Sequence, residues 1–447
     1  MRYAQLIYLF TALLSLNCAF AQGRFLLPKN VSKEKIKVKI VNNLIVIPVH
    51  INGVELSMLL DTGVRSTILF NANSNLKLNN ETKVVLTGAG AGEDAEAIKS
   101  THNIINIGAS SAINQTIVHL FDNERNFSSR LGFPVNGIIG YALFKDFIVE
   151  INYAREYINL YNKADYKRRN CRSCVTIPLE FHSSKPYALI QMQIGKNSFL
   201  AKLLVDTGSG DALWLFEESH KGITIPDNSF KDNLGLGFNG EVTGVRSKLD
   251  RLDLGDISLE KVNVAYPDSH SINYINRLHF RNGSLGSEVL KRFTVVIDYN
   301  SKKMLLKKNR FFDEPFKYDR SGLVIQHNGS DIIAEYDRKI IEEFSGDQQS
   351  GGYESVFLAT NTVEFKQFKL SPNFEVAAIR EESPGSKAGL RVGDKLIKIN
   401  GKKVRNLKLQ DITRYFYRDE GEVLKLEILR GGIAYDYKFA LKKILQD

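Results

Sequence analysis

The sequence predicts a mainly β chain made of two similar lobes, followed by a smaller α+β domain. A stretch of about 145 residues occurs twice, and repetition at a fixed offset indicates a duplicated structural unit. Segments inside each copy alternate apolar and polar residues, as half-buried strands do. The last part of the chain has a different order of strand, turn and helix signals. The length of 447 residues suits this division, because domains usually have about 100–200 residues.

Three pairs of matching segments indicate the repeat. The members of each pair lie 145 or 146 residues apart, and a shared offset makes a chance match implausible. The pairs are residues 56–63 with 201–208, 136–140 with 282–286, and 147–153 with 293–299. We therefore expect the first lobe at residues 22–165 and the second lobe at residues 166–312.

Each copy is expected to be rich in strands. Residues 35–41 and 188–194 alternate in the way of strands, and Asn-Gly pairs such as Asn52-Gly53 mark tight turns between them. The helical stretches are short, and the best of them are residues 142–145 and 288–291.

The first 21 residues read as a secretory signal peptide. Arg2 is followed by an apolar run over residues 6–16 and by Ala19-Phe20-Ala21, which has the small residues of a cleavage site. The apolar run is too short to span a bilayer, and no later stretch is long enough. We expect an exported protein, periplasmic or secreted, without a transmembrane segment.

The composition excludes several classes of protein. With 43% apolar and 25% charged residues, the chain is neither disordered nor fibrous. A net charge of +10 comes from 60 basic and 50 acidic residues without clustering, so we expect no nucleic-acid partner. The eight histidines form no HExxH motif, and we expect neither a metal nor a cofactor.

A Cys-x-x-Cys pair lies between the two copies, at Cys171 and Cys174. Such a pair can be redox-active, half of a metal site or a small disulfide. No second pair completes a metal site, and no thioredoxin-like context surrounds it. A small disulfide in the linker is the favoured interpretation, because exported proteins meet oxidising conditions.

Each copy places a carboxylate, Asp61 or Asp206, after an apolar run and before Thr-Gly. The glycine allows a tight turn that lifts the acid out of its strand, and the threonine hydroxyl can bind backbone. Two lobes related by a twofold axis would bring the acids face to face. Two carboxylates about 3 Å apart share one proton, and such a pair can activate a water and protonate a leaving group.

The two copies resemble the aspartic peptidases, in which Asp-Thr-Gly marks each half of the active site. The resemblance covers residues 35–310 and is to the retropepsin-like single lobe, duplicated into a pepsin-like pseudo-dimer. It implies an acid-protease β-barrel in each lobe and a protein or peptide substrate. Val64, where Ser or Ala is commoner, departs from the family pattern, and so does Ser284 in an otherwise apolar position.

The resemblance also implies roles for individual residues. Asp61 and Asp206 would be the catalytic pair, and Ser209 would bind the carboxylate of Asp206. Flap hairpins are expected near residues 87–92 and 235–240. The residues expected to support the active site are Thr62, Gly63, Thr207, Gly208, Ser209, Ile139, Gly140, Leu285 and Gly286.

The C-terminal segment resembles a PDZ domain. The run SPGSKAGLRVGDKLIKINGKKV over residues 383–404 carries the resemblance, within a domain expected at residues 318–447 with its core at 371–446. PDZ domains bind an extended peptide as an added strand and capture its terminal carboxylate. We place that loop near Gly322 and Leu323, a helix at 407–417, and a polar insertion at 342–353.

The sequence as a whole predicts an exported, monomeric aspartic-type endopeptidase whose PDZ domain binds a peptide or regulates access. The alternative is an inactive protease fold that binds peptides or acts as a scaffold through its PDZ domain. The two differ in whether the pair Asp61 and Asp206 is needed for turnover.

Overall fold

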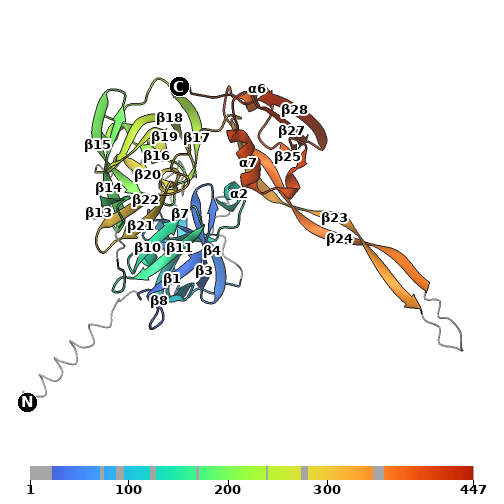
Figure 1. The fold of residues 1–447 in the computed structure, drawn as a ribbon, viewed down its shortest axis with the longest axis horizontal. Coiled ribbons are helices and arrows are strands. Elements are labelled where there is room, and N and C mark those ends of the chain that lie inside the picture. Colours follow the sequence, from blue (N-terminus) through green and yellow to red (C-terminus); the bar gives the residue numbers. More distant parts are fainter. Residues whose placement is uncertain are drawn as a thin grey trace, which may run out of the picture.

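The computed structural model describes residues 23–70, 75–86, 95–120, 127–167, 171–237, 240–272, 280–345 and 357–445. The predicted signal peptide lies outside these ranges, and so does the tip of the first predicted flap, 87–92. Figure 1 shows two lobes, coloured blue to cyan and green to yellow, with the orange to red C-terminal domain beside them.

The first lobe is an eight-stranded sheet that is extended by a pairing between β3 and β7. Its order is β2 (Lys39–Val41), β3 (Leu44–Ile51), β4 (Val54–Leu60), β9 (Gly137–Ile139), β5 (Thr67–Leu69), β8 (Ser110–Leu120), β7 (Ala95–Ile107) and β6 (Thr82–Leu86). Two short helices, α2 (Phe127–Leu131) and α3 (Tyr141–Phe144), flank β9.

The second lobe repeats this topology strand for strand. Its order is β13 (Glu180–His182), β14 (Lys185–Ile194), β15 (Asn197–Val205), β20 (Gly283–Leu285), β16 (Leu213–Leu215), β19 (Ile257–Pro267), β18 (Gly240–Leu254) and β17 (Phe230–Gly237). The pairing of β14 with β18 matches that of β3 with β7. Its short helices are η2 (Glu217–Ser219), η3 (Ser269–Ile272) and α5 (Ser287–Leu290).

A six-stranded sheet joins the lobes. Its order is β1 (Lys33–Lys37), β11 (Tyr157–Asn162), β10 (Phe147–Asn152), β21 (Phe293–Asp298), β22 (Lys303–Lys308) and β12 (Cys174–Pro178). The seam is the antiparallel pair of β10 and β21, in which Val149 opposes Ile297. Both residues belong to one apolar core that continues into both lobes, so the lobes share a single buried cluster.

The C-terminal domain has its own sheet and its own core. Its strands are β23 (Leu323–Ser345), β24 (Phe357–Ile379), β25 (Lys395–Ile399), β26 (Lys402–Lys403), β27 (Val423–Arg430) and β28 (Ile433–Ala440). Its helices are α6 (Pro384–Lys387), η4 (Val404–Asn406), α7 (Leu409–Thr413) and η5 (Arg414–Tyr417). Residues such as Phe374, Val376 and Ile428 form a core separate from that of the lobes.

The fold class predicted from the sequence is confirmed: the chain is mainly β, with two pseudo-symmetric sheets and a C-terminal domain of strands and short helices. The helix expected at 407–417 is divided, because α7 gives way to the tighter 3₁₀ turns of η5.

The ladder of β23 and β24 runs through the first residues of the polar insertion expected at 342–353, and residues 346–353 lie outside the described residues. This ladder extends from Leu323 opposite Ile379 to Ser345 opposite Phe357. Backbone hydrogen bonds form such a ribbon whatever the polarity of its side chains. Figure 1 shows the ribbon projecting far from the rest of the molecule.

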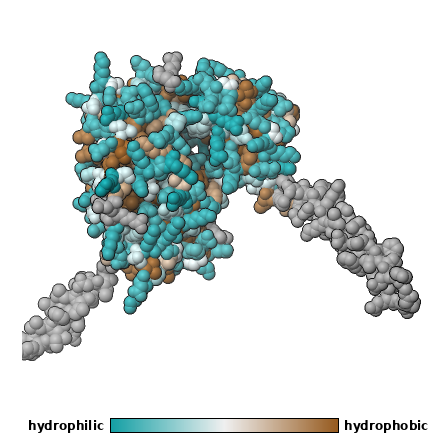
Figure 2. Space-filling view, in the orientation of Figure 1, coloured by the Kyte–Doolittle hydropathy of each residue, from teal (hydrophilic) through white to brown (hydrophobic). Residues whose placement is uncertain are grey.

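The face shown in Figure 2 is largely hydrophilic, with scattered hydrophobic patches. The strands account for this, because alternate residues point to opposite faces and the apolar ones enter the core.

Candidate active site

Asp61 and Asp206 each follow the central strand of a lobe. The strand β4 ends at Leu60 and runs parallel to β9, so that the N–H of Asp61 donates to Ile139 O at 2.9 Å. In the second lobe the N–H of Asp206 donates to Leu285 O, also at 2.9 Å. The predicted apolar-Gly segments therefore lie directly beside both aspartate turns.

The two glycines after these segments permit a close approach of backbone. A Cβ on Gly140 would lie 1.9 Å from Asp61 O, and a Cβ on Gly286 would lie 2.2 Å from Asp211 O. Real side chains do not fit at such distances, so glycine is required for each segment to cross its aspartate loop.

Thr62 and Thr207 join the two aspartate turns. The N–H of Thr62 donates to Thr207 Oγ1 at 3.0 Å, and the N–H of Thr207 donates to Thr62 Oγ1 at 3.1 Å. The hydroxyl of Thr62 donates to Val205 O at 2.5 Å, and that of Thr207 to Leu60 O at 2.8 Å. Both side chains are fully buried, so this reciprocal set of bonds fixes one turn against the other.

The two carboxylates lie against each other. A Cβ on Gly208 would lie 2.2 Å from the carboxylate carbon of Asp61, and a Cβ on Gly63 would lie 3.2 Å from Asp206 Oδ1. Each acid also accepts a hydrogen bond from its own glycine, Gly63 to Asp61 at 2.6 Å and Gly208 to Asp206 at 3.1 Å. The side chains therefore form one shared site between the lobes.

Burial and proximity shift the titration of this pair. Burial, followed by the charge of Asp206, raises the pKa of Asp61 to about 8. Burial also raises the pKa of Asp206, while the charge of Arg281 opposes this. A pair of this kind holds one proton between two acids over a wide range of pH.

Ser209 lies beside the aspartate pair, but its hydroxyl points away from the carboxylate of Asp206. Its N–H donates to Asp206 O at 3.4 Å, and its hydroxyl faces Gly286. Among the described residues, its hydroxyl makes no hydrogen bond to the carboxylate of Asp206.

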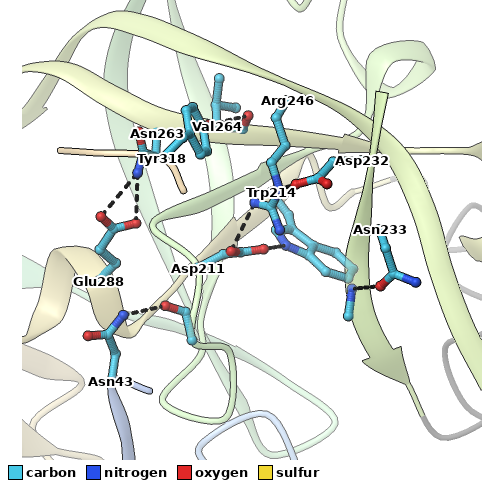
Figure 3. A network of polar contacts seen from close by, with 12 residues as sticks. Asn43, Asp211, Trp214, Asp232, Asn233, Arg246, Asn263, Val264, Glu288 and Tyr318 are labelled. Atoms are coloured by element: carbon cyan, nitrogen blue, oxygen red, sulfur yellow. Dashed lines mark hydrogen bonds and ion pairs between the residues drawn. The ribbon is translucent and has the colours of Figure 1, made fainter. Parts of the chain in front are cut away.

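A network of polar side chains supports the turn that carries Asp206 (Figure 3). Asp211 accepts from Trp214 Nε1 at 2.7 Å and from Arg246 Nη1 at 3.0 Å, and Arg246 Nε donates to Asp232 at 2.8 Å. Arg246 lies on β18 and Asp232 on β17, the two strands of the flap hairpin in the second lobe. The turn after Asp206 is therefore tied to the base of this hairpin.

Two cations near the pair were missed by the sequence analysis. Lys185 begins β14, and Arg281 lies just before β20. The charge of Lys185 lowers the pKa of both aspartates, and that of Arg281 lowers the pKa of Asp206. Aligning the two copies at the offset of 146 residues would have shown that Arg281 corresponds to Val135 of the first copy.

The PDZ loop predicted at Gly322 and Leu323 already binds an internal carboxylate. Asp319 accepts the N–H of Ser321 at 3.0 Å and the N–H of Gly322 at 2.6 Å, and the N–H of Leu323 donates to Ser321 Oγ at 3.1 Å. These donors are the kind that capture a terminal carboxylate in a backbone nest. In this structure they are satisfied within the loop.

Cys171 and Cys174 are joined by a disulfide in the structure, with 5.3 Å between their Cα atoms. Within the described ranges, no group of three or more His, Cys, Asp or Glu side chains could hold a metal ion. No helix of the described chain is long and apolar enough to cross a membrane. A cavity lined by Phe216, Tyr266 and Ile272 lies in the second lobe and contains neither Asp61 nor Asp206.

Comparisons with known proteins agree with part of this description. The family model of the PDZ domain matches residues 375–430. Among solved structures, the crystal structure of an aspartic proteinase from Irpex lacteus matches with 14% identity and a TM-score of 0.40, over 63% of this chain and 99% of that chain. A comparison with the curated proteins finds no match. Residues 375–430 belong to the PDZ domain family, and they follow two lobes that each present one Asp-Thr-Gly turn.

Proposed function

We propose that this protein is an aspartic-type endopeptidase in which Asp61 and Asp206 activate a water to hydrolyse peptide bonds. The observation that carries the proposal is the contact between the two carboxylates, held together by the reciprocal hydrogen bonds of Thr62 and Thr207. If Asp-Thr-Gly served only as a turn or a helix cap, neither its second copy nor the contact between the carboxylates would be needed.

The chemistry follows from the shared proton. The ionised acid of the pair removes a proton from a bound water, which attacks the peptide carbonyl carbon. The protonated acid gives its proton to the carbonyl oxygen during this attack, which forms a tetrahedral diol. The other acid then passes the proton that it took from the water to the amide nitrogen. The C–N bond breaks, and a hydroxyl of the diol returns a proton to the first acid. A pKa of about 8 for Asp61 keeps a proton on the pair up to neutral pH, which this division of roles requires.

We propose that the protein is exported, since the first 21 residues have the features of a signal peptide. We also propose that it acts as a monomer, because the lobes of one chain supply both aspartates. A soluble protein or peptide is the expected substrate.

The PDZ domain is proposed to regulate access to the site. Its Leu409 packs on the first lobe, where a Cβ on Gly132 would lie 2.5 Å from the Cβ of Leu409, and Gln410 Nε2 donates to Leu131 O at 3.2 Å. On the second lobe, Arg380 lies 3.8 Å from Asp232 of the flap hairpin. The domain therefore contacts both lobes, one of them at its flap.

The short helix α2 links these contacts. It packs against β23 of the C-terminal domain, and its Arg130 forms an ion pair of 2.8 Å with Glu241 on β18 of the flap hairpin. A peptide that adds to the free edge of β23 would compete with α2 for this strand. Such competition would loosen the contact between α2 and the flap.

A second candidate function is peptide binding without turnover, through the same site between the lobes or through the PDZ domain. The position of β23 favours it, because β23 is the edge strand of the C-terminal sheet in the described chain and a peptide strand can add to such an edge.

The experiment is cleavage of casein from pH 3 to 8 by the purified protein, beside Asp61→Asn and Asp206→Asn. Loss of cleavage in both folded variants supports the proposal. Cleavage that survives in either variant contradicts it. No cleavage by any of the proteins, together with peptide binding that both variants retain, favours the second candidate.

A further inference from the structure

The residues around the aspartate pair differ between the two copies, although the strand order of the copies matches. In the first lobe a two-residue turn at Asn42 and Asn43 joins β2 to β3, and both residues have positive φ. Ser183 and Ser184 make the same turn in the second lobe, also with positive φ. The next residue is Leu44 in one copy and Lys185 in the other, so these two residues occupy equivalent places.

This turn lies at the aspartate pair. Asn43 Nδ2 donates to Gly210 O at 2.8 Å, and Leu44 Cδ2 lies 3.9 Å from where a Cβ of Gly210 would be. The turn of the first lobe therefore contacts the loop that carries Asp206. The matching topology of the lobes would place the turn of the second lobe opposite the loop that carries Asp61. The charges of both aspartates act on Lys185, in agreement with this placement.

A second pair of equivalent positions shows the same change. The first lobe has Val135 and Ile138, both buried in an apolar cluster against which Leu44 packs. The second lobe has Arg281 and Ser284 at these places, at the offset of 146 residues. Arg281 Nε donates to Gly283 O at 3.0 Å, and one of its Nη atoms contacts the hydroxyl of Ser284.

Among the described residues, the two cations have no acidic partner apart from the catalytic pair. Neither Lys185 nor Arg281 takes part in an ion pair within the part of the chain that the structure describes. The sequence between Asp268 and Glu288, which includes Arg281, has no acidic residue. Arg281 is 7% exposed, and burial lowers the pKa of both cations, with the charge of Arg281 adding to the effect on Lys185.

Buried cations without counter-ions are costly, because desolvation is not offset by an opposite charge. The catalytic pair supplies about one negative charge when it shares a proton. This leaves a surplus of positive charge at Lys185 and Arg281. A bound carboxylate would offset the surplus with charge-assisted hydrogen bonds.

We propose that Lys185 and Arg281 form a subsite of the second lobe that binds a carboxylate of the substrate, supplied by an Asp or Glu side chain. The facing subsite of the first lobe, where the partly buried Leu44 covers Val135 and Ile138, takes an apolar side chain. The protein then selects peptides with an acidic residue on one side of the scissile bond and an apolar residue on the other. This inference rests on the proposed function and adds a substrate class to it.

The test uses a library of peptides blocked at both ends, so that side chains supply the carboxylates. The wild-type protein is expected to cleave peptides with Asp or Glu at one fixed position, and to bind them more tightly than the matched Asn or Gln peptides by fluorescence anisotropy. A peptide ending in a free carboxylate at that position shows whether a chain terminus can replace the side chain. Equal cleavage and binding of acidic and amide peptides would overturn the inference.

A matched pair of variants assigns the effect to the subsite. Lys185→Leu places the residue of the first lobe in the second. It is expected to lower the ratio of kcat/KM for acidic over amide peptides by about tenfold or more, because a hydrogen bond between charged groups is lost. Lys196→Leu removes the same charge from the exposed turn at the far end of β14 and β15, and should keep the wild-type ratio.

The outcomes separate the inference from the proposed function. An unchanged ratio in Lys185→Leu would overturn the inference, while cleavage of amide peptides would leave the proposed function standing. If the wild-type protein cleaves no peptide, the proposed function fails. The binding preference of wild type and Lys185→Leu then still decides whether the carboxylate subsite exists.

Discussion

Thr62 and Thr207 hold the two halves of the site together, each donating its N–H to the other's hydroxyl, at 3.0 and 3.1 Å. The hydroxyl of Thr62 donates to Val205 O, and that of Thr207 donates to Leu60 O. These two carbonyl groups lie at the ends of the strands that lead into the two aspartates. This set of bonds crosses the seam between the lobes where no water can replace them, because both threonines are fully buried.

Replacing Thr207 by valine should destabilise the protein and reduce its activity together. The change removes the acceptor of the buried Thr62 N–H and the hydroxyl that donates to Leu60 O, and a buried group left unpaired costs about 1–3 kcal/mol. Denaturant unfolding of Thr207→Val against wild type measures the loss. Thr67→Val is the matched control, because the buried hydroxyl of Thr67 has no hydrogen-bond partner in the structure. Equal losses in the two variants would contradict the role of Thr207.

The activity of the protein should fall on the alkaline side as the pair loses its shared proton. The pKa of about 8 for Asp61 places this limb of the pH–rate profile near pH 8, within about one pH unit. Lys185→Leu should move the limb to higher pH, because the positive charge of Lys185 lowers the pKa of both aspartates. A profile of kcat/KM for wild type, Lys185→Leu and Lys196→Leu tests this. A limb that moves to lower pH in Lys185→Leu would contradict the assignment.

Asp61→Asn should be inactive and yet gain stability relative to wild type as the pH rises. Burial raises the pKa of Asp61 from the 3.8 of an unperturbed carboxyl to about 8, so between these values the folded chain holds a proton that the unfolded chain has released. The unfolding free energy of wild type therefore falls with rising pH over this range. Melting temperatures of both proteins at pH 4.5 and pH 7.5 measure the effect. Asp256→Asn, in an exposed turn, is the control and should follow wild type.

Gly132→Ala should weaken the docking of the C-terminal domain on the first lobe. Gly132 has φ of +61°, and an added Cβ would lie 2.5 Å from the Cβ of Leu409. Gly53→Ala is the control for backbone strain alone, because Gly53 has φ of +86° and no atom lies within 4 Å of its Cβ position. Limited proteolysis at the linker near residues 313–320 should be faster in Gly132→Ala than in Gly53→Ala. Equal rates would indicate that the contact with Leu409 contributes nothing to docking.

The duplicated fold could be predicted because its signals are local. An apolar run before Asp-Thr-Gly, and a short strand that ends just before Gly140 or Gly286, can be recognised wherever they occur in a sequence, and the shared offset relates the two copies. The structure brings Asp61 and Asp206 together by the topology that the offset implies.

The two cations beside the aspartate pair could not be predicted in the same way. Lys185 and Arg281 are separated by almost a hundred residues and belong to no motif, so their proximity depends on how β14 and β20 flank β15. The long ribbon of β23 and β24 was also missed, because backbone pairing determines it and its side chains show no clear alternation. The role of Asp319 could not be predicted either, because its hydrogen bonds form only once the loop at Ser321 folds around it.

Whether both aspartates act in one catalytic site is measured most directly by kcat/KM of Asp206→Asn on a single cleaved peptide. If the pair is both the general base and the general acid, this value should fall at least about a thousandfold. Asp256→Asn should keep the wild-type value. A folded Asp206→Asn protein that retains kcat/KM near that of wild type would contradict the account.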